Sequence, residues 1–258
     1  MQISVADGKI VGVNSAHQIF IRTGVSLTRP HGSGWKRISG ALKHVSVGDG
    51  KIMGVNKYDQ IWFRTGVSSS RPEGTGWKYI SGRLKQISVG DGKIMGVNKA
   101  NQIWFRTGVS TRYPYGTGWK KISGGLKYIS VGDGKIMGVN KYDQIWFRTG
   151  VSSSRPEGTG WKRIDGGLKQ IEVGDGRIVG VNKNNQIWIR IGIDATHPYG
   201  TGWKHISGGL KHIDVGDGKV LGVSNGDVVY FRFGLKTTNG KLNSNSVIRP
   251  LDLLNTYY

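Results

Sequence analysis

The sequence has no cysteine, so no disulfide can staple the fold and no thiol can act as a nucleophile or metal ligand. It also has no run of about 18 apolar residues, which excludes a membrane-spanning helix. The first residues, Met1–Val5, lack the basic region and apolar stretch of a signal peptide, so none is expected.

Acidic residues are scarce. The chain has 16 Asp and Glu against 37 Lys and Arg, a formal net charge of +21 over 258 residues. The excess is spread along the whole chain, so it should cover the whole surface. Solubility alone usually needs a net charge of about 2–8 in a small domain. A surface of this charge attracts anions such as lipid A phosphates, acidic polysaccharides, anionic membranes or nucleic acid.

Clustered catalytic or metal-ligating groups are also missing. The histidines do not fall at ligand spacings, and the three glutamates, Glu73, Glu157 and Glu172, are too scattered to suggest an acid–base pair. We therefore predict no catalytic residue, no metal site and no cofactor, and hence no enzyme.

A repeat of 42 residues fills the chain. It is visible in three series at that spacing: Trp35, Trp77, Trp119, Trp161 and Trp203; Asn14, Asn56, Asn98, Asn140 and Asn182; Arg22, Arg64, Arg106, Arg148, Arg190 and Arg232. Residues 48–78 and 132–162 are identical. The sixth copy is the most degenerate, with Ser224, Val228 and Asn245 in place of Asn, Gln and Trp. We expect that blade to serve closure, and binding sites to lie mainly among the other five copies.

Each copy predicts four strands. In one copy these are 77–80, 85–89, 93–98 and 102–106, with an Asp-Gly hairpin turn at 91–92 and a longer loop, 107–117, before the next Trp. Four strands in about 40 residues are typical of a propeller blade. We therefore predict an all-β fold, a single six-bladed β-propeller of four-stranded antiparallel blades spanning residues 1–258. A straight β-solenoid would need caps at both ends, and none is apparent.

The chain ends predict how the ring closes. Residues 1–5 match the second strand of a repeat, and 247–250 match the missing first strand, with Ile248 at the register of Ile80. We expect the N- and C-terminal strands to share one blade, with 245–258 as closing strand and tail.

One aspartate recurs in every copy: Asp7, Asp49, Asp91, Asp133, Asp175 and Asp217. These carboxylates could form a ring for calcium or could simply belong to hairpin turns. We favour turns, because Asp-Gly in a two-residue loop needs no other explanation.

The tryptophans form two sets. The Trp77 set (Trp35, Trp77, Trp119, Trp161 and Trp203) is expected to wedge between blades as core. The Trp62 set (Trp62, Trp104, Trp146 and Trp188) shares a strand face with the Arg64 set (Arg64, Arg106, Arg148 and Arg190). An aromatic face beside a guanidinium suits sugar binding, because the apolar sugar face stacks on the ring. Interblade core is an equally good interpretation of these tryptophans.

Other candidate binding groups lie near that set. The turn after each Gly-Val-Asn carries the Lys57 set (Lys57, Lys99, Lys141 and Lys183), and Tyr58 and Tyr142 follow two of these lysines. The long loop varies at one position, occupied by His31, Glu73, Tyr115, Glu157 and Tyr199. Variation concentrated in one loop of a rigid scaffold is a common plan for binding.

The elements Trp-Lys-x-Ile-Ser-Gly-x-Leu-Lys-x-Ile-Ser, Gly-Val-Asn and Gln-Ile-Trp resemble the tectonin repeat. This resemblance implies a six-bladed propeller without catalytic activity that binds glycans or bacterial surface sugars such as lipopolysaccharide, in innate defence. It also implies a secreted, extracellular protein. Animal members often carry disulfides, and this chain has none, so a cytoplasmic location stays open.

Three functions remain open. A multivalent lectin would bind sugars through several equivalent sites. A charge-led polyanion binder would tolerate changes of sugar and lose affinity with salt; no nucleic-acid motif accompanies the charge, so nucleic acid is not the expected partner. A structural or adhesive scaffold is the third. The specific sugar, the calcium dependence and the oligomeric state do not follow from the sequence.

Overall fold

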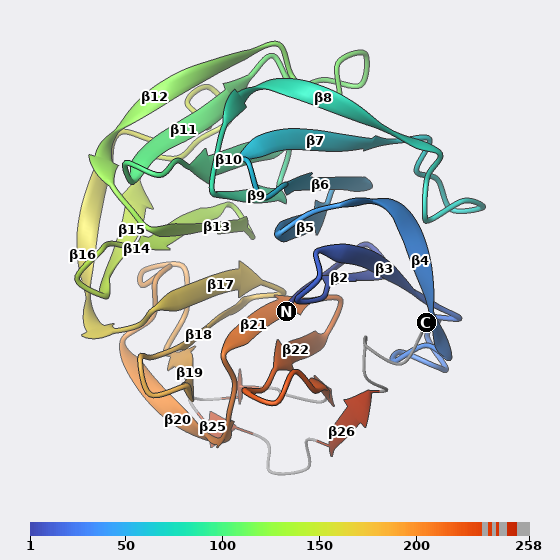
Figure 1. Cartoon of the computed structure of the whole chain (residues 1–258). Coiled ribbons are helices and arrows are strands. Elements are labelled where there is room, and N and C mark those ends of the chain that lie inside the picture. The colour runs from blue at the N-terminus through green and yellow to red at the C-terminus, as the bar shows by residue number, and fades with distance from the viewer. Residues whose placement is uncertain (234–236, 239–240, 243–246, 252–258) are drawn as a thin grey trace.

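The computed structural model is a ring of six β-sheets around a central axis (Figure 1). It describes residues 1–233, 237–238, 241–242 and 247–251. None of these residues belongs to a helix, so none forms a helix long and apolar enough to cross a membrane. The predicted all-β, six-bladed propeller of four-stranded antiparallel sheets is confirmed.

The first three blades run from axis to rim in sequence order. They are β1 (Gln2–Ala6), β2 (Lys9–Val13), β3 (Gln18–Thr23) and β4 (Gly34–Ala41); β5 (His44–Gly48), β6 (Lys51–Val55), β7 (Gln60–Thr65) and β8 (Gly76–Arg83); and β9 (Gln86–Gly90), β10 (Lys93–Val97), β11 (Gln102–Thr107) and β12 (Gly118–Gly125).

The other three blades repeat this plan. They are β13 (Tyr128–Gly132), β14 (Lys135–Val139), β15 (Gln144–Thr149) and β16 (Gly160–Gly167); β17 (Gln170–Gly174), β18 (Arg177–Val181), β19 (Gln186–Ile191) and β20 (Gly202–Gly209); and β21 (His212–Gly216), β22 (Lys219–Val223), β23 (Val229–Phe233) and β26 (Val247–Leu251). A small two-stranded sheet, β24 (Thr237–Thr238) and β25 (Lys241–Leu242), lies between β23 and β26 in the chain.

The strand order within a blade differs from the expectation by one strand. The strand that carries Trp77, β8, pairs with β7, so that Ile61 lies opposite Ile80 and Arg64 opposite Trp77. It is therefore the outermost strand of its own blade and not the first strand of the next. The long loop folds back as a hairpin because Arg64 Nε donates to the Glu73 carbonyl (2.7 Å) and the Thr75 N–H donates to the Thr65 carbonyl (2.7 Å).

This shift changes how the ring closes. Residues 2–41 already form a complete first blade, and β26 pairs with β23 in the sixth, so the expected blade shared by the two terminal strands is not formed. Closure depends on packing instead, since Ile3, Val5 and Phe20 share one core cluster with Leu221 and Phe231. The N-terminal ammonium lies 3.5 Å from Asp227 Oδ1 of the sixth blade. Asn245 and the tail residues 252–258 lie outside the described residues.

Tight approach of the inner strands holds the blades together near the axis. A Cβ on Gly132 would lie 2.2 Å from the carbonyl oxygen of Val173 in the next blade, so only glycine fits there. The neighbouring Asp-Gly turns have the expected left-handed backbone, with φ of 51° at Asp91 and 69° at Gly92. The turn interpretation of the recurrent aspartate is confirmed.

Those aspartates also connect the blades. Each carboxylate accepts the N–H of the glycine in the next blade's turn, from Gly50 on Asp7 (2.7 Å) round to Gly8 on Asp217 (2.7 Å); the donors between them are Gly92, Gly134, Gly176 and Gly218. The described residues contain no group of three or more Asp, Glu or His that could hold a metal ion.

Candidate functional site

Members of both tryptophan sets line the same clefts between neighbouring blades. The cleft between the second and third blades has a volume of about 270 Å³. Its walls are Ile61, Gly82, Arg83 and Leu84 from the second blade and Asn98, Trp104 and Trp119 from the third. The repeat therefore brings one member of each tryptophan set to one cleft.

The same cleft recurs around the ring. Trp146 and Trp161 line the cleft between the third and fourth blades (about 210 Å³), and Trp188 and Trp203 line the next (about 150 Å³). At the junction of the first and second blades, Trp62 and Trp77 pack against the core cluster of the first blade. Four junctions thus carry a tryptophan pair.

The Trp77 set is fixed by hydrogen bonds across the junctions. Trp119 Nε1 donates to the Ser81 carbonyl (2.7 Å), and equivalent bonds join Trp77 to Ser39, Trp161 to Ser123 and Trp203 to Asp165. Glycine makes room for the ring, because a Cβ on Gly82 would lie 3.0 Å from Trp119 Nε1. These rings wedge between blades, as expected, but from Trp77 onward each stays partly exposed.

The Trp62 set is half-buried in all four copies. Trp104, for example, packs against the core of the second blade and also lines the cleft. The two interpretations of this set are therefore compatible: one part of each ring is interblade core, and another part is a cleft wall.

The Arg64 set lies beneath the Trp77 set and does not line the three clefts described above. Arg64 is 4 % exposed, and its guanidinium carbon lies 5.0 Å from the centroid of the Trp77 ring. Equivalent contacts join Arg106 to Trp119, Arg148 to Trp161 and Arg190 to Trp203. Burial lowers the pKa of Arg64, Arg106 and Arg148 from its ordinary value. The structure places these arginines to support the indole ring.

The Lys57 set borders the clefts on exposed turns. Asn98 lines a cleft and Lys99 follows it directly, with a side chain 81 % exposed. In two copies the lysine is paired with a tyrosine: Lys57 Nζ lies 5.0 Å from the Tyr58 ring centroid, and Lys141 Nζ lies 4.9 Å from that of Tyr142. Tyr58 is 59 % exposed and Tyr142 is 69 % exposed, so both rings can meet a ligand.

The variable loop position connects blades, a role that the sequence did not suggest. Glu73 pairs with Lys36 of the preceding blade and Glu157 with Lys120, while Tyr115 accepts from Lys78 and Tyr199 from Lys162. The bond with Lys36 lowers the pKa of Glu73, and Lys120 does the same for Glu157. The available signal was a lysine 37 residues before each of Glu73, Tyr115, Glu157 and Tyr199.

The two remaining junctions differ. Phe20 replaces the Trp62-type residue where the sixth blade meets the first, and it is 1 % exposed in the closing core. Between the fifth and sixth blades, Tyr230 and Arg232 line an apolar cleft of about 310 Å³.

Comparison with known proteins identifies the repeat. A family model described as "Tectonin domain" matches residues 1–225. No curated protein matches the chain. A chain in the crystal structure of the nidogen–laminin complex is similar in fold, with a TM-score of 0.63, 11% identity and 92% of each chain covered.

Two further solved structures share the fold. Prp20p from Saccharomyces cerevisiae has a TM-score of 0.58 and 10% identity, with 98% of this chain and 77% of that chain covered. Human WBSCR16 has a TM-score of 0.58 and 10% identity, with 91% and 76% covered. At these identities the likeness shows a common propeller fold.

Proposed function

This chain belongs to the Tectonin domain family, and we propose that it is a multivalent lectin whose sugar sites are the clefts between its blades. The family suggests lectin-like binding. The ligands that we propose are glycans or bacterial surface sugars, lipopolysaccharide among them, in innate defence. For such ligands we propose an extracellular location, which detection of the protein in the medium of the producing cells would test.

The paired tryptophans in equivalent clefts are the observation that carries this proposal. Trp104 and Trp119 present indole surface to one narrow cleft of about 270 Å³. The apolar face of a pyranose packs well on such a surface, and polar groups at the edge fix its orientation. The Nε1–H of Trp119 is already bonded to Ser81, so sugar hydroxyls must find other partners, such as the glycine carbonyls of the opposite wall.

The surroundings of the clefts favour sugars that carry anionic groups. The lysine that follows each cleft asparagine, such as Lys99, stands beside the cleft; the Lys99 side chain is 81 % exposed, with its ammonium 3.5 Å from Asp59 Oδ2. Lipopolysaccharide combines sugars with phosphates and would engage both the indoles and the lysines. The proposed site is therefore the two tryptophan sets with Lys57, Lys99, Lys141, Lys183, Tyr58 and Tyr142, and the Arg64 set as its support.

The test is a glycan and lipopolysaccharide array probed at about 0.1 M and about 0.5 M salt. At the higher concentration the Debye length falls well below about 10 Å, so exposed charges are largely screened. We expect binding to specific sugars to persist there, and Trp104→Ala to weaken it while Trp104→Phe, which keeps an aromatic ring, retains part of it.

A charge-led polyanion binder or adhesive scaffold is the second candidate, because the net charge of +21 needs a role even without a specific sugar. For that candidate, binding would be lost at about 0.5 M salt, would tolerate any anionic polymer and would not respond to Trp104→Ala. An array silent for sugars at both salt concentrations would reject the lectin.

A further inference from the structure

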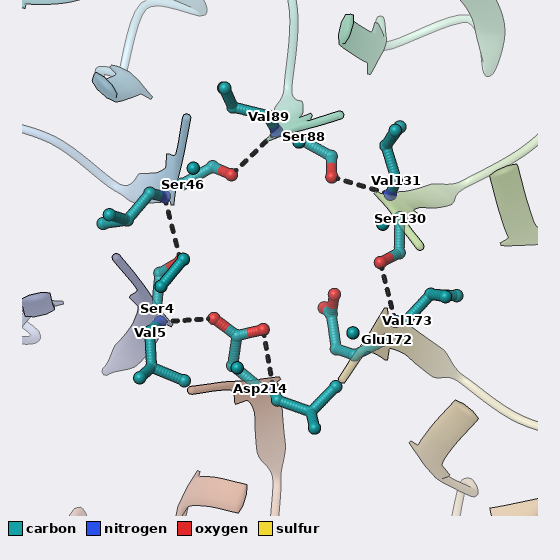
Figure 2. A pocket seen from close by; sticks show the side chains of 18 of the residues that line it. Ser4, Val5, Ser46, Ser88, Val89, Ser130, Val131, Glu172, Val173 and Asp214 are labelled. Carbon is teal, nitrogen blue, oxygen red and sulfur yellow. Dashed lines mark hydrogen bonds between the residues drawn. The ribbon is translucent and has the colours of Figure 1, made fainter. Parts of the chain in front are cut away.

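A ring of side chains at the axis connects each innermost strand to the next (Figure 2). Serine hydroxyls accept the backbone N–H of a valine one blade on, each at 3.0 Å: Ser4 from Val47, Ser46 from Val89, Ser88 from Val131 and Ser130 from Val173. Acidic residues hold the last two positions of this ring, Glu172 on β17 and Asp214 on β21. Asp214 Oδ2 still bonds to the next blade, accepting from the N–H of Val5 (2.7 Å).

The ring of bonds is interrupted where the fifth blade meets the sixth. The N–H of Val215, which by repeat should donate to residue 172, donates instead to Oδ1 of Asp214 in its own strand (2.9 Å). Glu172 Oε1 accepts from the Tyr128 hydroxyl and from Gln170 Nε2 (2.8 Å), so it points back toward its own side of the junction. In Figure 2 the dashed lines around the ring stop between Glu172 and the strand of Asp214.

The two carboxyl groups lie in poor surroundings for charge. Glu172 is 8 % exposed and Asp214 is half-buried, and both groups line the axial cavity of about 200 Å³. Their hydrogen-bond partners are neutral: the hydroxyls of Tyr128, Ser130 and Ser4, the amide of Gln170, and the backbone N–H groups of Val5 and Val215. Two neighbouring carboxylates without a bonded cation destabilise each other when both are ionised.

We propose that the contact between the fifth and sixth blades at Glu172 and Asp214, here called the joint, responds to pH. The two inner strands stay packed together while the pair holds a proton, and their contact loosens when both groups ionise. Other bonds keep the joint from separating. The Gln170 side chain donates to the Ile213 carbonyl (2.7 Å) and accepts its N–H (3.1 Å), and Asp175 accepts the N–H of Gly218. The joint therefore loosens at Glu172 and Asp214, between these two sets of bonds, rather than along the whole junction.

The direction of the pH effect follows from burial. Burial, reinforced by the charge of Asp214, raises the pKa of Glu172 to about 8, and burial raises the pKa of Asp214 to about 7. Because the folded chain holds these protons more tightly than the unfolded chain, their stabilisation is complete below the ordinary carboxyl pKa of about 4. It is lost progressively as the pH rises toward about 8.

The other groups around the cavity do not reverse this direction. Burial keeps the pKa of His44 on β5 low, at about 3, also lowers that of His212 on β21, and raises that of Tyr128 on β13, so all three stay neutral through this range. At the cavity mouth, Arg177 and Lys219 pair with Asp175 and Asp217 (3.5 Å each). The remaining facing groups are the amino terminus beside β1 and the turn aspartates Asp7, Asp49, Asp91 and Asp133.

The test measures melting temperature against pH for the full chain, Glu172→Ser and Ser88→Ala. Glu172→Ser installs the residue that four blades already have, and it should melt several degrees above the parent at pH about 8.5, with the gain shrinking toward pH about 4. Ser88→Ala removes the hydrogen bond to the Val131 N–H without removing a charge, so the fall in melting temperature that it causes should not vary with pH. A gain for Glu172→Ser that is the same at every pH, or no gain, overturns the proposal.

Hydrogen exchange locates the effect and covers a variant that fails to fold. In the parent, protection of the Val215 amide should fall between pH about 6 and about 8.5, beyond the intrinsic rate change, while the equivalent amide of Val131 stays protected. Glu172→Gln, which keeps the shape of the side chain, should abolish that fall. Equal behaviour of Val215 and Val131 in the parent would contradict the joint.

Discussion

At the scale of single residues, buried arginines explain how half-exposed indoles keep a fixed position. Arg148 lies with its guanidinium carbon 5.0 Å from the Trp161 ring centroid, and it donates to the carbonyls of Glu157 (2.8 Å) and Gly158 (3.2 Å). These bonds tie the long loop to the third strand of the blade. The Trp161 indole therefore rests on Arg148, which is itself held in place by its hydrogen bonds to the loop.

Replacing this support should weaken both the fold and one cleft. We expect Arg148→Met to destabilise the protein by about 2 kcal/mol, because hydrogen bonds from a charged donor contribute about 1.5–3 kcal/mol and the lost desolvation penalty offsets part of that. Urea unfolding measures the loss. Lys183→Ala, at an exposed turn, is the control and should change stability by less than about 0.5 kcal/mol. Equal stabilities of the two variants would contradict a supporting role for the arginine.

The supporting role of the Arg64 set was not predicted from the sequence, because the strand that carries Trp77 was assigned to the wrong blade. Assigned to the next blade, Trp77 was no neighbour of Arg64, and the guanidinium was left free for a ligand. In the paired strands the two residues are directly opposite each other. The tryptophan faces were predictable, because alternation along a strand depends on that strand alone. Pairing partners could not be predicted in this way. Turn residues show where a strand ends, but they do not show with which neighbouring strand the next one pairs.

At the scale of elements, the two terminal strands occupy different positions and stabilise different parts of the ring. β1 lies innermost, where Val5 bonds to Asp214, and Gln2 Nε2 donates to the Val45 carbonyl (2.8 Å). β26 lies at the rim and pairs with β23. The period of the repeat was enough to predict six blades, but the register predicted for the degenerate C-terminal strand was wrong. Ile248 lies opposite Arg232, and Leu251 is the residue opposite Val229, where the second blade has Ile80 opposite Ile61.

Deleting each terminal strand should therefore have unequal effects. Removal of residues 247–258 takes the outer strand from the sixth blade, and we expect the melting temperature to fall by roughly 5–10 °C with the ring intact, as a loss of a few kcal/mol implies. Removal of residues 1–6 opens the axis on two sides and should prevent folding. Thermal unfolding followed by circular dichroism measures both. An unchanged melting temperature for the first deletion would show that β26 does not complete the blade.

At the scale of the whole molecule, two kinds of blade junction alternate along the first five blades. The junctions ahead of the second and fourth blades carry the exposed Tyr58 or Tyr142 on the turn after Gly-Val-Asn and a lysine–glutamate bridge at the loop. The junctions ahead of the third and fifth blades have Ala100 or Asn184 at the same position and a lysine–tyrosine bridge. The four junctions with a tryptophan pair therefore fall into two chemically different pairs, a division that a period of 42 residues does not reveal.

If the clefts bind sugar as proposed, titration calorimetry with a free sugar identified on the array should resolve two classes of sites with two members each. Trp62→Ala with Trp146→Ala should remove one class, and Trp104→Ala with Trp188→Ala the other. Tyr58→Ala with Tyr142→Ala should make the classes converge, because it removes the exposed ring that distinguishes them. Each single cleft can be weak, with a Kd of about 1 mM, and the rigid ring would still hold a dense glycan surface by avidity. Four equal sites in the parent would contradict the division, and a tryptophan pair whose loss weakens all four sites would show that the clefts do not bind independently.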